Sequence, residues 1–154
     1  MPRTRPRLAV LMFLALCLTA MACTRGADVP SPSPTDFAGI VEQLAKRGIL
    51  VANVVAGDAG CPDATLAPTA IAFDASGLDQ REPIRIRVYI FRNHDAWQRL
   101  SGSVASCAHA YVTDSSTYES LAPSPFVVSG QGPWPPGFAA ALKDGFTVAA
   151  GSGD

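Results

Sequence analysis

The sequence predicts an α+β domain in which three helices pack on a mainly antiparallel sheet of four or five strands. Residues 84–90 alternate between two kinds of side chain, a period of two that is typical of a strand. Along residues 36–147 the predicted order is helix, strand, strand, strand, helix, strand and helix, with one further weak strand and short connections of mixed kind. Both observations fit a layer of helices on a sheet.

The strand at residues 84–90 leads directly into a predicted helix. One face of this strand is apolar, and the other carries Arg85, Arg87, Tyr89 and, just beyond it, Phe91. A half-polar strand favours an antiparallel sheet. In the helix that follows, Asn93 is suited to the N-cap and Asp95 to the first turn. Apolar residues at helical spacing would press this helix onto the sheet: Trp97, Leu100 and Val104.

Residues 1–22 have the pattern of a secretory signal peptide. Three arginines precede an apolar segment at residues 8–18, which is too short to span a bilayer comfortably, and small residues follow it. Ala20-Met21-Ala22 is a site for ordinary signal peptidase. The same residues followed by Cys23 resemble the bacterial lipobox, in which the cysteine receives diacylglycerol. Residues 23–35 are rich in Pro and Ser, which is typical of a flexible tether.

The first half of the domain, which we place at residues 36–154, begins with an amphipathic helix at 36–47 that ends before Gly48. Residues 49–55, ILVANVV, are nearly all apolar and predict a strand covered on both faces. The next segment, AGDAG at 56–60, is expected to be a turn, because it lacks the spacing of a phosphate-binding loop. Residues 69–73 predict a second strand, and residues 74–82 a connection rich in turns.

The second half contains weaker signals. Residues 107–112 alternate and predict a short strand, and residues 114–117 a polar loop. A further strand is predicted at 125–129, followed by a loop at 130–137, GQGPWPPG, whose prolines favour turns and extended backbone. The last helix is predicted at 138–147.

Four cysteines constrain the chemistry of the chain. Cys17 lies in the signal and Cys23 at its end, which leaves Cys61 and Cys107. In an exported domain two such residues most simply form a disulfide. An alternative is an extracytoplasmic enzyme that uses Cys61, Cys107 and His109 as a thiol or metal site, with His94 or Asp63 as a further ligand or base. No catalytic signature surrounds either cysteine, and no cofactor motif is evident.

Two aromatic segments are candidates for a binding surface. Trp134 is flanked by prolines in a loop bounded by glycines, so it could be an exposed anchor or could fold over the core. Tyr89 and Phe91, beside Arg85 and Arg87, leave the same two alternatives open. Removal of the arginines in the signal would make the mature chain more acidic than its full-length net charge of −1, which argues against nucleic-acid binding.

At VYIFRNHDAWQRL and SPFVVSGQGPWPPGFAAALKDGF the chain resembles small bacterial lipoproteins of unassigned function. This resemblance implies an envelope-associated domain with Cys23 as the residue that bears the lipid. We therefore expect an extracytoplasmic protein, anchored to a membrane through Cys23, that binds an envelope protein or a small ligand and is not an enzyme. If Cys23 is not acylated, the expected location is secreted.

Overall fold

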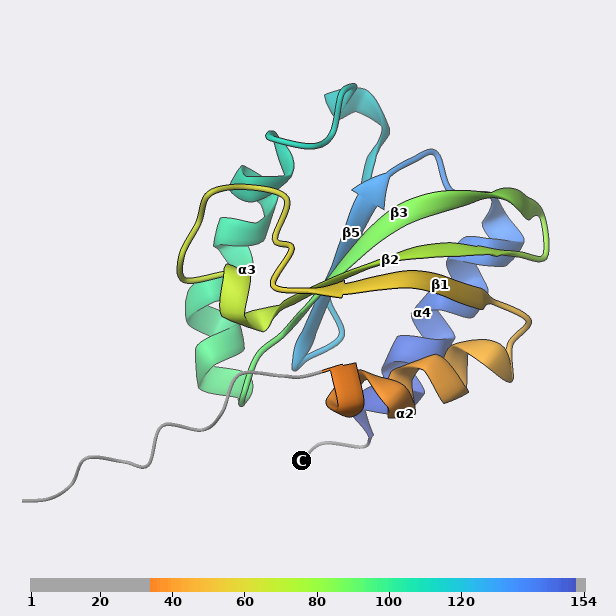
Figure 1. Cartoon of the computed structure of the whole chain (residues 1–154), viewed down its shortest axis with the longest axis horizontal. Coiled ribbons are helices and arrows are strands. Elements are labelled where there is room, and N and C mark those ends of the chain that lie inside the picture. Colours follow the sequence, from red (N-terminus) through yellow and green to blue (C-terminus); the bar gives the residue numbers. More distant parts are fainter. Residues whose placement is uncertain (1–33, 152–154) are drawn as a thin grey trace, which may run out of the picture.

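The computed structural model describes residues 34–151, and side chains from Phe37. The expected signal peptide, Cys23 and nearly all of the expected tether lie outside the described residues. Three α-helices and five strands form the fold (Figure 1): α2 (Pro34–Ala45), β1 (Leu50–Ala56), β2 (Ala70–Gly77), β3 (Gln80–Ile90), α3 (His94–Ala108), β4 (Tyr118–Leu121), β5 (Phe126–Gln131) and α4 (Pro136–Ala150). Short 3₁₀ turns precede β2 and β4. None of the helices within residues 34–151 is long and apolar enough to cross a bilayer.

All neighbouring strands are antiparallel, in the order β1-β2-β3-β5-β4. The strand predicted at residues 84–90 is the middle strand of the sheet, since β3 pairs with β2 on one side and with β5 on the other. The register places Ile86 opposite Phe73, and Val88 opposite both Ile71 and Val128. The structure therefore confirms the predicted α+β class with a five-stranded sheet.

Helices α2 and α4 cover one face of the sheet. The apolar face of β3 and the matching residues of its neighbours meet these helices in the larger core, whose fully buried aromatic members are Phe37, Phe73, Phe138 and Phe146. Helix α2 ends close to the predicted place, and Gly48 follows it with a φ of +80°, which a glycine adopts without steric cost. Helix α4 extends beyond the predicted 138–147 at both ends. At its N-terminus, Asp79 from the β2–β3 turn accepts hydrogen bonds from the N–H groups of Gly137 and Phe138 at 2.8 and 2.7 Å.

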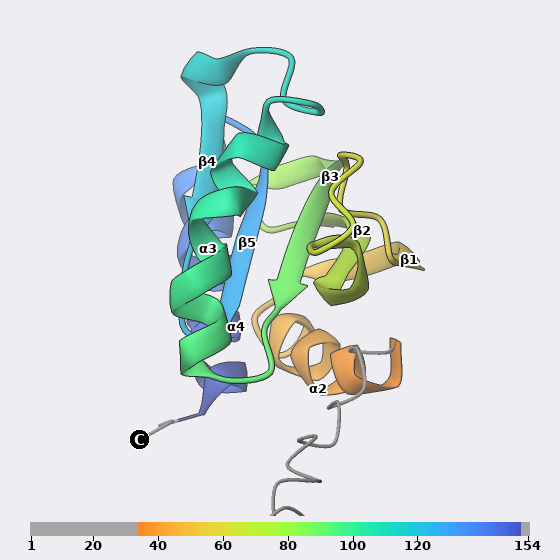
Figure 2. The ribbon, with the colours of Figure 1, turned by 90° about the vertical axis from the view of Figure 1, so that its left-hand side faces the viewer.

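Helix α3 covers the opposite face, as Figure 2 shows, with α4 behind the sheet. Asn93 is the N-cap as predicted, and its side-chain oxygen accepts a hydrogen bond from the N–H of Ala96 at 2.8 Å. Val104 is fully buried, and the Trp97 indole donates to the carbonyl oxygen of Phe126 at 3.1 Å. A smaller core lies between α3 and the sheet and contains Tyr89, Phe91 and Cys107.

Two local predictions are wrong. Strand β1 is not covered on both faces: six of its seven residues are exposed, because it is an edge strand whose one neighbour among the described strands is β2. Residues 107–112 do not form a strand, since the C-terminal turn of α3 and the following turn occupy them. Strand β4 was not predicted, because a four-residue strand such as YESL carries too little alternation to show a period.

Two boundaries also differ from the sequence predictions. Helix α2 begins at Pro34, so the last two residues assigned to the tether belong to the domain. Strand β2 continues through Gly77, and the connection to β3 shrinks to a tight turn at Leu78 and Asp79. A polar residue such as Asp74 can lie in the strand because its side chain faces away from the larger core. On that face, Asp74 accepts a hydrogen bond from Arg85.

Candidate functional site

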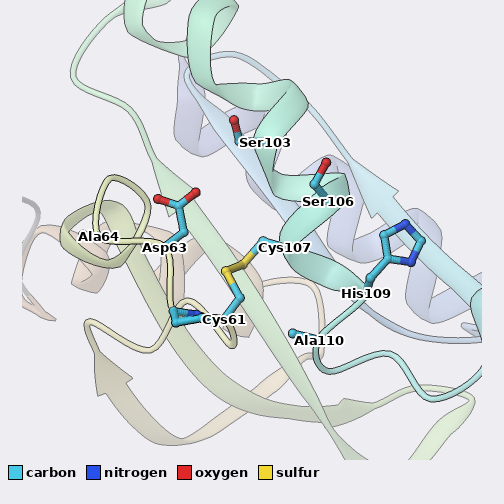
Figure 3. Close-up of a pocket in the computed structure, with 9 residues that line it drawn as sticks. Cys61, Asp63, Ala64, Ser103, Ser106, Cys107, His109 and Ala110 are labelled. Carbon is cyan, nitrogen blue, oxygen red and sulfur yellow. A yellow bond between two sulfur atoms is a disulfide. The ribbon is translucent and has the colours of Figure 1, made fainter.

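The connection between β1 and β2, residues 57–69, is joined to helix α3 through two cysteines. The Sγ atoms of Cys61 and Cys107 lie at disulfide distance, 1.92 Å, with their Cα atoms 5.4 Å apart. Cys61 lies in the connection, and Cys107 is buried in the last turn of α3 (Figure 3). This pairing closes a chain segment of 46 residues that includes β2 and β3.

An open depression of about 800 Å³ lies over this pair of cysteines. Figure 3 shows Asp63 on the side of the 57–69 connection, and Ser103, Ser106 and His109 on the side of α3. Hydroxyl and imidazole groups both donate and accept hydrogen bonds, so the depression suits a polar ligand or a polar protein surface. The depression lies between two segments that only the tertiary structure brings together.

One oxygen of the Asp63 carboxylate is used within its own loop. Oδ1 accepts hydrogen bonds from the hydroxyl and N–H of Thr65 at 2.7 and 2.8 Å, and from the N–H of Leu66 at 3.2 Å. These contacts, the Thr65 hydroxyl first, hold the pKa of Asp63 below its ordinary value. Asp63 therefore stays ionised at neutral pH and shapes the rim of the depression.

The two cysteines lie together as the expected pair, and the alternative thiol or metal site does not form in this arrangement. Both cysteines are paired, so neither offers a free thiolate as nucleophile or ligand. Among residues 34–151 no group of three His, Cys, Asp or Glu side chains is placed to hold a metal ion. His94 lies at the other end of α3, where its Nδ1 is 3.0 Å from the Ser124 hydroxyl and its ring stacks on Trp97.

A second polar cluster lies on the same face of the sheet, beside α3. Asp58 lies between two arginines of β3: its carboxylate is 3.2 Å from Arg87 Nη2 and 3.4 Å from Arg85 Nη2. The Arg87 guanidinium also lies over the Tyr111 ring, 4.2 Å from its centroid. The Tyr111 hydroxyl is 2.6 Å from that of Ser129, which is fully buried. Charged groups of opposite sign thus lie in contact, and the cluster ties the 57–69 connection to the sheet.

Asp58 is ionised in this cluster. Its partial burial opposes ionisation, but the charge of Arg87 and hydrogen bonds from Arg87, Gly60 and Arg85 together outweigh it, so the pKa of Asp58 lies below its ordinary value. A carboxyl whose pKa is lowered by folding stabilises the folded state above its unfolded pKa of about 3.9. That contribution is lost as the pH falls through the lower pKa of the folded state.

We expect Asp58→Asn to lower the free energy of unfolding at pH 7 and to have a diminishing effect as the pH falls below about 4. The cause is protonation of Asp58 in the wild-type chain, which removes the same charge that the substitution removes. Urea unfolding of both chains at pH 7, 5 and 3 measures the difference. In the control, Glu82→Gln at an exposed position of β3, we expect a change within about 0.5 kcal/mol. A difference for Asp58→Asn that is equal at pH 7 and pH 3 would contradict the assignment.

The aromatic residues considered for a binding surface lie inside the domain. Tyr89 is fully buried, and its hydroxyl donates to the carbonyl oxygen of Ala59 at 2.8 Å. Burial, and then the neighbouring Tyr111, raise the pKa of Tyr89, which therefore remains a hydrogen-bond donor. Phe91 is 2% exposed and packs under α3. The sequence left open whether Tyr89 and Phe91 are exposed or covered, and in the structure both are covered.

Trp134 is also buried, with 5% of its surface exposed. Its indole N–H donates to the carbonyl oxygen of Gln131 at 3.2 Å, and its backbone N–H donates to Glu119 at 2.7 Å. The ring packs edge-on against Phe138, with centroids 6.5 Å apart. Trp134 therefore closes the larger core. Arg85 alone of the five proposed surface residues keeps about a third of its side chain exposed.

Several residues of these clusters escaped the sequence analysis. Asp58 lies in AGDAG, which is a turn as expected: the N–H of Gly60 donates to Asp58 Oδ1 at 2.9 Å. The one signal that could have singled it out is a lone carboxylate in a small-residue loop of a chain whose β3 carries two adjacent outward arginines. Nothing in the sequence marks Tyr111, Ser103 or Ser106, because their neighbours come from distant segments.

The fold and these contacts define a small α+β domain whose β1–β2 connection is held to helix α3 by two paired cysteines. No protein-family model, curated protein or solved structure matches the chain. The functional conclusions below therefore rest on the residues themselves.

Proposed function

We propose that this chain is a bacterial lipoprotein, anchored to a membrane through Cys23, whose α+β domain is a binding module of the cell envelope. The observation that carries the proposal is the order of residues 3–23: three arginines, an apolar segment, and small residues immediately before a cysteine. A thiol at the new amino terminus is the group that a lipidation pathway acylates.

The physical chemistry of such an anchor fits the chain. A single acyl chain binds a membrane only marginally, whereas the two or three chains of a lipoprotein cysteine attach it stably. Half of the residues from Thr24 to Ser33 have polar side chains, and two are prolines. A segment of this composition supports a role as a spacer between Cys23 and helix α2, which begins at Pro34.

The described domain supports the second half of the proposal. Paired cysteines at disulfide distance are typical of proteins in oxidising compartments. The depression beside them offers hydroxyl, imidazole and carboxylate groups to solvent, which favours recognition of a polar partner. Because both cysteines are paired, the structure gives no support to the alternative thiol chemistry.

We expect cells that express the full chain to incorporate a clickable fatty acid into it, and Cys23→Ala to abolish that label, because the thiol of Cys23 is the acceptor. Cys17→Ala is the matched control, since this cysteine lies within the apolar segment and should leave the label intact. Labelling is measured by in-gel fluorescence, together with the intact mass of the membrane-extracted protein. Label that persists in Cys23→Ala, or a wild-type chain without acyl mass, would refute the anchor.

A further inference from the structure

The large exposed hydrophobic side chains of the described domain are concentrated at one edge of the sheet. Leu50, Val54 and Val55 belong to β1 and are 69%, 41% and 46% exposed. Leu78, 53% exposed, lies beside Gly48, just before this strand. Among the described residues, Val148 on α4 is the remaining large hydrophobic side chain of comparable exposure. Apolar groups concentrated in this way on a protein surface typically mark an interaction site.

The two edges of the sheet differ in how they are protected. The β4 edge is four residues long and carries Glu119, and a short or charged edge discourages pairing with another chain. The β1 edge has seven residues, LVANVVA, without a charge or a proline, and no described strand pairs with its outer side. Its unpaired N–H and C=O groups are therefore open to a further strand, apart from the carbonyl oxygen of Asn53, which accepts a hydrogen bond from Arg85 Nη1 at 2.8 Å.

We propose that β1 is a dimerisation edge, on which β1 of a second copy pairs antiparallel about a twofold axis at Asn53. Asn53 is the middle residue of the strand, with three residues on either side. It lies in the β-bulge between Ala52 and Val55, has a φ of +49°, and donates a hydrogen bond to Asp74 at 2.7 Å. This bulge interrupts the edge, so an unrelated straight strand could follow only half of it.

In a dimer of two identical strands, each β1 carries the same bulge at the same position. Twofold antiparallel pairing about Asn53 places residues 50–52 of one copy beside residues 54–56 of the other, and brings the two bulges together at the axis. Such an interface is isologous, because each segment contacts its counterpart in both directions. The strand has no charge, so the pairing brings no like charges opposite each other. Val54 and Leu50 would then lie against the partner strand, where their apolar surface leaves water.

This edge is small for a permanent interface. Stable dimers bury about 1,200 Å² or more, and a single strand pair lies near or below that limit. We therefore expect a reversible dimer with a dissociation constant on the order of micromolar. The two five-stranded sheets would form one continuous sheet.

The test is sedimentation equilibrium of the mature chain, residues 23–154, carrying Cys23→Ala; this chain lacks both the apolar segment at 8–18 and the lipid, so it needs no detergent. The concentration range is about 1 to 500 μM, around the expected constant. We expect Val54→Lys to raise the dissociation constant by about tenfold or more, because an edge lysine must lose its hydration to pair. Val148→Lys is the matched control, with the same substitution at similar exposure on α4, and should stay within about twofold. Circular dichroism checks that each variant is folded.

A second variant, Leu50→Lys, guards against loss of folding in the first, because Leu50 is the most exposed of these side chains. Weakening by both edge variants and not by Val148→Lys supports the dimer. A chain that remains monomeric over the whole range overturns the proposal, as does a dimer that neither edge variant weakens. These results do not depend on acylation, so the fate of the anchor and that of the dimer are separate.

Discussion

Replacing Cys61 and Cys107 together with alanine is expected to lower the free energy of unfolding by about 4 kcal/mol. The pair closes a segment of 46 residues. In the chain-entropy model, a link across a loop of this length lowers the entropy of the unfolded chain, which raises its free energy by about 4 kcal/mol at 25 °C. For a domain of this size the loss corresponds to a fall in melting temperature of roughly 15 °C or more. Urea and thermal unfolding followed by circular dichroism measure the change.

The same experiment has two internal checks. Reduction of the wild-type chain should lower its stability to nearly that of the double variant, and the single variant Cys61→Ala should match the double variant within about 1 kcal/mol. The 57–69 connection should also become more sensitive to protease, because it loses its covalent tie to α3 and keeps noncovalent ones such as the Asp58 ion pairs, the Tyr89 hydrogen bond and the burial of Leu66. A double variant as stable as the oxidised wild type would show that the link contributes little.

Gly77→Ala is expected to destabilise the domain by about 3 kcal/mol or more. Gly77 has a φ of +126°, a conformation that side chains rarely allow, and a Cβ atom here would overlap the carbonyl oxygen of Gly48. The backbone of Gly48 cannot move away easily, because Gly48 lies in the tight turn between α2 and β1. The strain would therefore separate the β2–β3 turn from the start of β1.

Gly57→Ala is the matched control for this substitution. Gly57 also has a positive φ, +82°, but a Cβ atom would meet nothing within 4 Å. Its expected cost is the conformational one alone, about 1 to 2 kcal/mol. Urea unfolding at 25 °C separates the two variants. Equal losses of stability would mean that the contact with Gly48 contributes nothing and that the φ angle accounts for the whole effect.

Local patterns predicted those elements whose signal is complete within a few residues. The alternation at residues 84–90 belongs to β3, and Asn93 caps α3, because a period and a cap depend only on neighbours along the chain. The first and last helices begin within about two residues of their predicted starts, since the apolar face of a helix is also a local property. Gly48, expected just after the first helix, has the positive φ that a glycine often adopts at such a position.

Failures of prediction share the opposite cause. An apolar run such as ILVANVV fits an interior strand and an exposed edge strand equally well, because exposure is set by which neighbours arrive from elsewhere in the chain. The inward position of Trp134 depends on Glu119 and Phe138, which lie in other elements. The contacts of Asp58 with Arg85 and Arg87 likewise join residues far apart in sequence.

The α+β class, the middle strand, the capped helix α3 and the residues behind the proposed anchor at Cys23 can all be found from the amino-acid order. The folded arrangement is needed to see that β1 is an open edge, that Tyr89 and Trp134 are core residues, and that Asp63, Ser103 and His109 surround one depression. The difference arises because periodic patterns and helix caps depend on residues that are close together in the chain. The burial of a side chain and the pairing of a strand are set by contacts between segments that are distant in the chain. These contacts depend on the order of the strands in the sheet.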